Sequence, residues 1–194
     1  MTTDFTDYSD IVPEGTIAIV QLGVRLGDAS DGLKRTKDGT GEGLDAEFTI
    51  VEGPHARRKF FAFLLVTGST DGQKQMADRN KATLKKIVDS AHFLEPGDKS
   101  PEARAKRTMA WRDFDGLRFL AEIGIEPGKN GYPDKNVIAK VITKDRPEWG
   151  GRPPIEQSPR DFGGAAASVG PAVAPIGPVA ATAPAPIARP KWAQ

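Results

Sequence analysis

Five runs with the periodicity of β-strands constrain the fold of this chain more than any other feature. The clearest is residues 44–52, in which Leu44, Ala46, Phe48 and Ile50 alternate with polar residues, as in a strand buried on one face. The other four runs are residues 16–26, 59–66, 117–126 and 136–143. Together they predict a β-rich domain, because five strands can share one core.

One long amphipathic helix is predicted between the third and fourth runs. Ser69 or Thr70 can cap its first turn, and Asp71 suits the positive end of the helix dipole. The predicted apolar stripe, interrupted only by its asparagine, consists of Met76, Asn80, Leu84, Ile87, Val88 and Ala91.

A second, shorter helix completes the element order. Ser100 can cap it and Pro101 suits its first position, so that it runs towards Trp111. The order is strand, strand, strand, helix, strand, strand, with a long loop, residues 27–43, between the first two strands. This order predicts a mainly β (α+β) fold with a five-stranded barrel of the OB type, whose second and third strands and 1–2 and 4–5 loops bind oligonucleotides or sugars. The alternative is a five-stranded antiparallel sheet packed on one helix.

Charge and composition divide the chain into three parts. Residues 1–15 carry four acidic and no basic residues, and this arm can imitate DNA phosphates, cover a basic surface or simply be solvated. Residues 16–150 form the predicted domain, which is mildly basic, with 23 Lys and Arg against 20 Asp and Glu. Residues 151–194 form a tail with a net charge of +2.

The tail is predicted to be a disordered spacer. Of the 28 residues 163–190, 20 are Ala, Pro or Gly, which leaves too little large apolar surface to offset the entropy of ordering. Proline also breaks helices and cannot complete a β-ladder. The tail ends in a basic-aromatic tip, where Lys191 and Trp192 either dock a replication or recombination protein or merely end the chain.

Several classes of chemistry are not supported by the sequence. The absence of cysteine excludes disulfides, thiolate metal sites and cysteine nucleophiles, and His55 and His92 have no metal-ligand spacing. Residues 39–43 lack the Lys-Ser/Thr ending of a P-loop. We therefore predict a protein that is not an enzyme and has no cofactor or metal. Without a signal peptide pattern or an apolar run of about 18 residues, a cytoplasmic protein without membrane contact is expected.

The first candidate site is a basic cluster that leads into an aromatic strand. Its residues are Arg57, Arg58, Lys59, Phe60, Phe61 and Phe63. Cations follow phosphates and flat rings stack on bases at about 1–3 kcal/mol each, so this pattern suits single-stranded nucleic acid. Phe61 and Phe63 share one face of the strand, and the pattern leaves open whether the phenylalanines form core or a stacking platform.

Two loops and one strand supply further candidates. The first loop carries Lys34, Arg35 and Lys37, although residues 28–43 have a net charge of −1 and also suit a plain solvated loop. The second is a hairpin connection, residues 126–135, with the tip residue Tyr132. Tyr132 either stacks on a base or lies along its own strand. The cations around this hairpin are Lys129, Lys135 and Lys140.

Short motifs in a fixed order cover most of residues 44–146. They are Glu47-Phe48-x-x-Val51-Glu52-Gly53, residues 58–63, residues 80–88, Gly116-Leu117-x-Phe119-x-Ala121 and Gly131-Tyr132-Pro133-Asp134-Lys135-Asn136-x-Ile138. In this order the chain resembles a family of phage-encoded proteins of formerly unknown function, found near replication and recombination genes. The resemblance implies an OB-like fold and binding of single-stranded DNA. The tail departs from bacterial single-strand-binding proteins, which end in an acidic tip, so it does not imply their usual replication partners.

We therefore expect a single-stranded DNA-binding protein of phage replication or recombination with little sequence preference. The alternative is a non-enzymatic inhibitor or adaptor that binds a host or phage protein. The preference between DNA and RNA and the oligomeric state stay open, and a homo-oligomer is compatible with the sequence.

Overall fold

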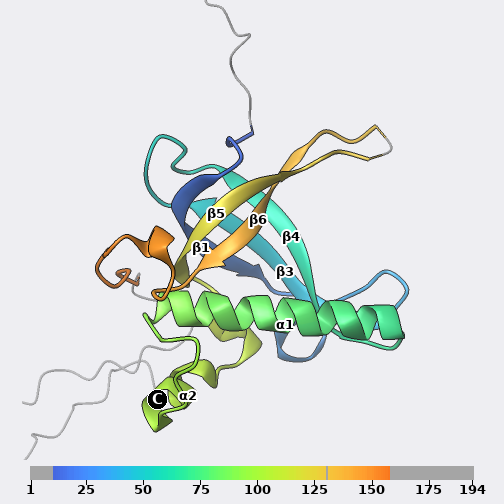
Figure 1. Ribbon diagram of the computed structural model, residues 1–194. Coiled ribbons are helices and arrows are strands. Elements are labelled where there is room, and N and C mark those ends of the chain that lie inside the picture. Colours follow the sequence, from blue (N-terminus) through green and yellow to red (C-terminus); the bar gives the residue numbers. More distant parts are fainter. Residues whose placement is uncertain (1–10, 130, 158–194) are drawn as a thin grey trace, which may run out of the picture. The chain divides into compact units, whose positions relative to one another are not determined.

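The computed structural model describes residues 11–129 and 131–157, except for the side chain of Ser30 (Figure 1). Most of the predicted arm and tail, including Lys191 and Trp192, lies outside these residues. The strands are β1 (Thr16–Arg25), β2 (Lys34–Arg35), β3 (Gly41–Ile50), β4 (Lys59–Gly68), β5 (Arg118–Glu126) and β6 (Lys135–Ile142). The helices are α1 (Asp71–Ala91) and α2 (Pro101–Arg107), with short 3-10 turns η1 (Ser30–Gly32), η2 (Trp111–Phe114) and η3 (Pro147–Trp149).

All strands form one antiparallel sheet with β1 at its centre. β1 pairs with β3 on one edge and with β5 on the other. β4 continues the sheet beyond β3, β6 continues it beyond β5, and the short β2 pairs with the start of β3. The predicted mainly β fold and its element order are therefore confirmed, with β2 as an additional strand.

The sheet is not closed into the barrel that the sequence predicted. β4 and β6 lie near each other, but no ladder joins them in the described part of the chain. α1 contacts β4, β5 and β6 instead, and its side chains Leu84, Ile87 and Val88 enter the core. In Figure 1 this helix crosses one end of the strands.

α1 begins where the sequence predicted but buries a different stripe. The hydroxyl of Thr70 accepts a hydrogen bond from the Gln73 amide at 3.3 Å, and the Gln73 Oε1 accepts one from the Thr70 amide at 3.2 Å. These two bonds form a capping box. The prediction of Met76 in the stripe is wrong, because Met76 is 54% exposed and Ala77 is buried instead. Ala77 lies two turns before the buried Leu84 on the same side of the helix, so the buried stripe runs through Ala77 and Met76 falls beside it.

Polar side chains attach both ends of the described unit to the sheet. The Asn136 Oδ1 accepts a hydrogen bond from the Val12 amide and its Nδ2 donates to the Val12 carbonyl, both at 2.8 Å. At the other end, the Gln157 side chain accepts from the Arg118 amide and donates to the Arg118 carbonyl, both at 2.9 Å. Val12 is buried in the core. The packed unit thus includes residues on both sides of the range 16–150.

A second, smaller apolar cluster covers the outer side of β5 and β6. It contains Leu120, Ile142 and Trp149, with Phe93 and Ile155 packed against it. The Phe93 and Trp149 ring centroids are 5.4 Å apart. Residues 149–155 therefore act as a cover for this side of the sheet. None of the helices in the described ranges is long and apolar enough to cross a membrane.

Candidate nucleic-acid interface

Two aromatic rings project from the outer side of β4. Phe60 points inward and stacks on Phe48, with ring centroids 5.3 Å apart, so it belongs to the core. Phe61 and Phe63 point outward and are 46% and 41% exposed. The alternation of the strand thus separates one core ring from two surface rings.

A glycine on β3 makes room for one of these rings. A Cβ on Gly43 would lie 2.8 Å from Cζ of Phe63 and 2.6 Å from the carbonyl oxygen of Leu64. Both separations are shorter than van der Waals contact. The ring of Phe63 can therefore lie close to β3 only because residue 43 has no side chain.

Arg25, at the end of β1, covers the second ring. Its guanidinium carbon lies 4.8 Å from the centroid of the Phe61 ring, within the range of a cation–π interaction. Its Nη2 donates to Asp45 on β3 at 2.7 Å, which fixes the guanidinium above the sheet. Arg25 was not among the residues that the sequence pattern indicated, although the polar phase of β1 places it on the outer face together with Gln21.

The cations of this surface are paired with carboxylates. Asp45 also binds Lys34 at 3.0 Å, while Glu47 binds Lys59 at 2.6 Å. We call the outer surface formed by Arg25, Lys34, Asp45, Glu47, Lys59, Phe61 and Phe63 the β3–β4 face. Next to it, Arg35 pairs with Glu42 at 3.5 Å.

The charges of the β3–β4 face lie in two layers. The side chains of Asp45 and Glu47 are only 14% and 25% exposed, whereas those of Arg25, Lys34 and Lys59 are 52–55% exposed. The carboxylates therefore lie low on the sheet and the cations extend further into solvent. A ligand that approaches this surface meets rings and positive charge first.

Asp45 stays ionised beneath these cations. Partial burial would raise the pKa of Asp45, but hydrogen bonds from Lys34 and Arg25 and the positive charges of both outweigh this effect. The pKa of Asp45 is consequently lower than usual. A phosphate that binds Arg25 or Lys34 must compete with this carboxylate, so the electrostatic contribution of the face is moderate.

The predicted loop residues lie at both ends of β4. β1 and β5 are antiparallel, with Thr16 opposite Ile123, so the loop after β1 and the loop after β5 emerge at opposite ends of the sheet. Lys34, Arg35 and Lys37 belong to the first end, and Lys37 is exposed. β4 has ten residues and spans about 30 Å between the two ends.

The other end carries the turn before β4 and the β5–β6 hairpin (Figure 1). Arg57 is exposed in the turn, with a φ of 70°, and Arg58 is half-buried. In the hairpin, Lys129 is exposed and Tyr132 is 78% exposed. Lys135 forms an ion pair with Glu126 at 2.9 Å.

Lys140 also lies apart from the β3–β4 face, as do the hairpin residues Lys129, Tyr132 and Lys135. Lys140 pairs with Glu148 of η3, next to the segment that covers the outer side of β5 and β6. The structure therefore brings Lys34, Lys59, Phe61 and Phe63 together, adds Arg25, and places Lys140 elsewhere. The described residues contain no group of three or more acidic or histidine side chains arranged to hold a metal ion.

Comparisons with protein families and with curated proteins found no relative of this chain. No protein-family model matches the chain, and no curated protein matches it. The function must therefore be inferred from the side chains of the chain itself.

Proposed function

We propose that the chain binds single-stranded DNA, with little sequence preference, through the β3–β4 face. The observation that carries the proposal is the pair of exposed rings, Phe61 and Phe63, flanked by Arg25, Lys34 and Lys59. The resemblance to the phage family extends the proposal to a role in phage replication or recombination.

Exposed rings favour a single strand over a duplex. Each ring can stack on an unpaired base, and base–aromatic stacking is worth about 1–3 kcal/mol. In a duplex the bases already stack on one another and their flat faces are hidden. Because every base has a flat face, stacking on Phe61 and Phe63 discriminates little between sequences.

The paired charges of the face support a moderate dependence on salt. Four cations, Arg35 included, stand against three carboxylates, so few phosphates gain an uncompensated positive partner. If about three phosphates are neutralised, the logarithm of the association constant should fall with a slope of about −2 against the logarithm of the salt concentration. A strongly basic groove would give a steeper slope.

The test is a fluorescence-anisotropy titration of the full chain with labelled oligothymidine at two salt concentrations. We expect binding at low salt that Phe61→Ala and Phe63→Ala together weaken at least about tenfold, because two stacking contacts are lost. Met76→Ala is the matched control, since it removes an exposed apolar side chain from α1. Absence of binding at low salt, or equal losses in both variants, would contradict the proposal.

The ion pairing of the cations favours a second candidate, a non-enzymatic protein that binds another protein through the same face. Mixed charges around exposed rings suit a protein surface as well as a polyanion. This candidate predicts no binding of oligothymidine. It also predicts that a pull-down partner is lost with the Phe61→Ala and Phe63→Ala substitutions but kept when residues 163–194 are removed.

A further inference from the structure

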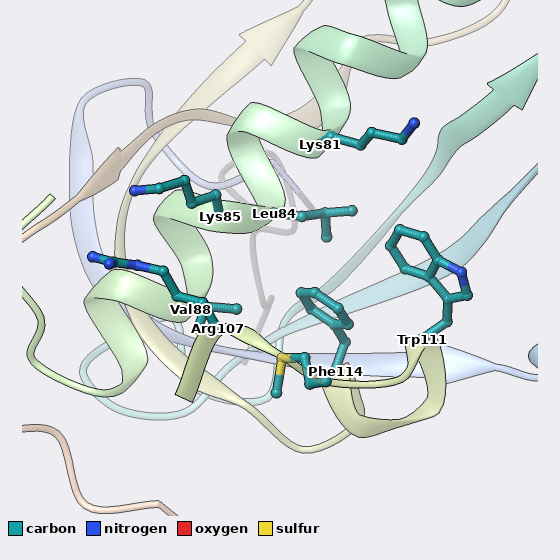
Figure 2. A pocket seen from close by; sticks show the side chains of 8 residues that line it. Lys81, Leu84, Lys85, Val88, Arg107, Trp111 and Phe114 are labelled. Carbon is teal, nitrogen blue, oxygen red and sulfur yellow. The ribbon is translucent and has the colours of Figure 1, made fainter. Parts of the chain in front are cut away.

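An apolar hollow lies between α1 and the segment that follows α2, and it shares no lining residue with the β3–β4 face (Figure 2). Its volume is about 180 Å³, and an apolar cavity of about 150 Å³ is large enough for benzene. The buried Leu84, Val88 and Phe114 form its base, so it can hold one aromatic ring. The complete lining is Lys81, Leu84, Lys85, Val88, Arg107, Met109, Trp111 and Phe114.

One cation of this lining has no carboxylate partner. Lys85 and Arg107 both bind the buried Asp89, at 2.6 Å and 2.5 Å, so much of their charge is neutralised. Lys81 is exposed and forms no ion pair with any residue that the structure describes. Its charge is therefore available to a ligand.

Trp111 adds a hydrogen-bond donor next to this cation. The indole N–H of Trp111 has no acceptor in the described ranges, and the side chain is half-buried. In Figure 2 the ammonium of Lys81 and the indole nitrogen lie on the same side of the hollow, opposite Lys85 and Arg107. A cation beside an N–H donor suits a carboxylate, which only accepts hydrogen bonds. The ligand that fits is thus an acidic peptide in which an aromatic ring stands beside a carboxylate.

The chain contains such a segment outside the described residues. Residues 4–10 read Asp-Phe-Thr-Asp-Tyr-Ser-Asp, and no basic residue occurs before Arg25. Phe5 stands between Asp4 and Asp7. Its ring suits the apolar base better than that of Tyr8, whose hydroxyl would exchange water for apolar contacts.

This segment and the hollow belong to opposite ends of the sheet. Val12 is held by Asn136 at 2.8 Å, at the end where β1 begins. The hollow lies near the end of β1, because Asp115, which follows the lining residue Phe114, accepts a hydrogen bond from the Val24 amide at 2.7 Å.

The segment is too short to join these two ends within one molecule. β1 has ten residues and spans about 30 Å. Phe5 is seven residues from Val12 and extends at most about 25 Å from it. A route around the surface is longer than the strand itself. Segment 4–10 can therefore enter only the hollow of another molecule.

We propose that the hollow binds segment 4–10 of a second copy of the chain, with the Phe5 ring on the apolar base and the carboxylate of Asp4 or Asp7 between Lys81 and the Trp111 N–H. Each copy then offers a segment at one end of its sheet and a hollow at the other, so the contact links neighbouring molecules. Because the β3–β4 face takes no part, the contact does not depend on DNA binding.

Other ligands fit this lining less well. In residues 158–194 the two rings have basic neighbours, since Trp192 follows Lys191 and Arg160 stands two residues before Phe162. Either would bring positive charge to Lys81. A nucleobase has several polar edge groups, which one N–H donor cannot satisfy.

A mixed-label NMR experiment on the full chain separates contacts between copies from contacts within one. The chain has no cysteine, so Thr2→Cys carries a single spin label. When this chain is mixed with an unmodified ¹⁵N-labelled chain, the amide signals of Leu84, Val88 and Met109 should broaden more than those of Phe61 and Phe63. Phe5→Ala in the spin-labelled copy should abolish this difference. Broadening centred on Phe61 and Phe63, or spread evenly over the unit, would overturn the proposal.

The charge of Lys81 provides a second test. A fluorescent peptide of residues 1–10 should bind the full chain carrying Phe5→Ala, whose own segment no longer competes. Lys81→Glu should weaken this binding about fivefold or more, since reversing a charge removes an ion pair and adds repulsion. The matched control is Lys86→Glu, on the same helix but outside the lining, which should change it less than twofold.

The outcomes separate this proposal from the DNA-binding proposal. Equal effects of Lys81→Glu and Lys86→Glu, or no saturable peptide binding, would overturn the assignment of the hollow and leave DNA binding untouched. If oligothymidine displaced the peptide and Lys81→Glu reduced DNA binding as much as Phe61→Ala does, the hollow would belong to the DNA path and the proposal would be wrong.

Discussion

Arg107 donates from its Nε to the fully buried carboxylate of Asp89 at 2.5 Å and thereby ties the end of α2 to the last turns of α1. The same guanidinium donates to the backbone carbonyls of Glu95 and Asp98. Lys85, on the exposed side, is the second cation on Asp89, at 2.6 Å. One buried carboxylate thus organises the connection between the two helices.

Removing Arg107 should strongly destabilise the fold. Arg107→Ala removes the more buried of the two cations on Asp89 and leaves only the exposed Lys85, and breaking a buried ion pair by removing one partner costs about 3–5 kcal/mol. The free energy of unfolding, measured by urea denaturation, should fall by about this amount. Lys85→Ala is the matched control and should cost about 1 kcal/mol or less, because an exposed partner contributes little. Equal losses in the two variants would contradict the dominant role of Arg107.

Gly43 should be required for the β3–β4 face. In Gly43→Ala the new methyl group meets Phe63 and the carbonyl of Leu64, so the ring and the ladder must move apart. We expect a loss of about 1–3 kcal/mol in unfolding free energy, as in other overpacked sites, together with weaker binding of oligothymidine. Gly72→Ala is the control, because its Cβ would meet open space in the first turn of α1. It should be neutral or slightly stabilising.

Acid should weaken the fold through Asp45. Its pKa in the folded chain is below the value of about 3.9 for an unfolded chain. Protons therefore bind the unfolded state more readily, and the stabilisation by Asp45 is complete above about pH 5 and is lost as the pH falls through the folded pKa. The difference in unfolding free energy between the wild type and Asp45→Asn should be constant from pH 7 to 5 and should shrink below about pH 4. A difference that is as large at pH 3 as at pH 7 would contradict this assignment.

The sequence predicted those elements whose pattern is local. The strands β3 and β4 show clear alternation or continuous apolar runs, and the capping box of α1 is encoded within four residues. The local pattern could not predict which side chains of an element meet its neighbours in the fold. Ala77 lies on the side of α1 that faces the sheet, where Asn80 donates to the Leu65 carbonyl, whereas Met76 lies beside this stripe and remains exposed.

β6 shows the same limit in a strand. Alternation along residues 136–143 places Val141 and Ile142 on opposite faces of the strand, yet both are buried. Val141 lies in the main core, and the cover formed around Trp149 buries Ile142 on the opposite face. This cover comes from residues outside β6 and has no signal within the strand itself.

The sequence indicated only some residues of the candidate site, for a related reason. Lys59 and Phe61 are near neighbours in the chain and suggested a site directly. Arg25 reaches Phe61 only because β3 lies between β1 and β4 in the sheet, a relation that depends on strand pairing. In the sequence, Asp45 and Glu47 have the pattern of residues on the solvent-facing side of a strand. Their ion pairs follow from the pairing of β3 with β1 and β4.

Asn136 should hold the first described residues onto the sheet. Its side chain pairs with both backbone groups of Val12 and also donates to the carbonyl of Gly124 at 3.3 Å, so it replaces a short piece of ladder. Asn136→Ala leaves buried backbone groups without partners, and we expect a loss of about 2–3 kcal/mol in unfolding free energy. Asn80→Ala is the matched control, since Asn80 donates a single hydrogen bond, to the carbonyl of Leu65, and should cost about 1 kcal/mol.

Hydrogen exchange locates the effect of Asn136→Ala. The Val12 amide should lose its protection in this variant, because its acceptor is the Asn136 Oδ1. The amide of Ala46 in β3, which lies in the middle of the sheet, should change only in proportion to the global loss of stability. Unchanged protection of Val12 would mean that the segment is held by the burial of its side chain alone, and the role assigned to Asn136 would then be wrong.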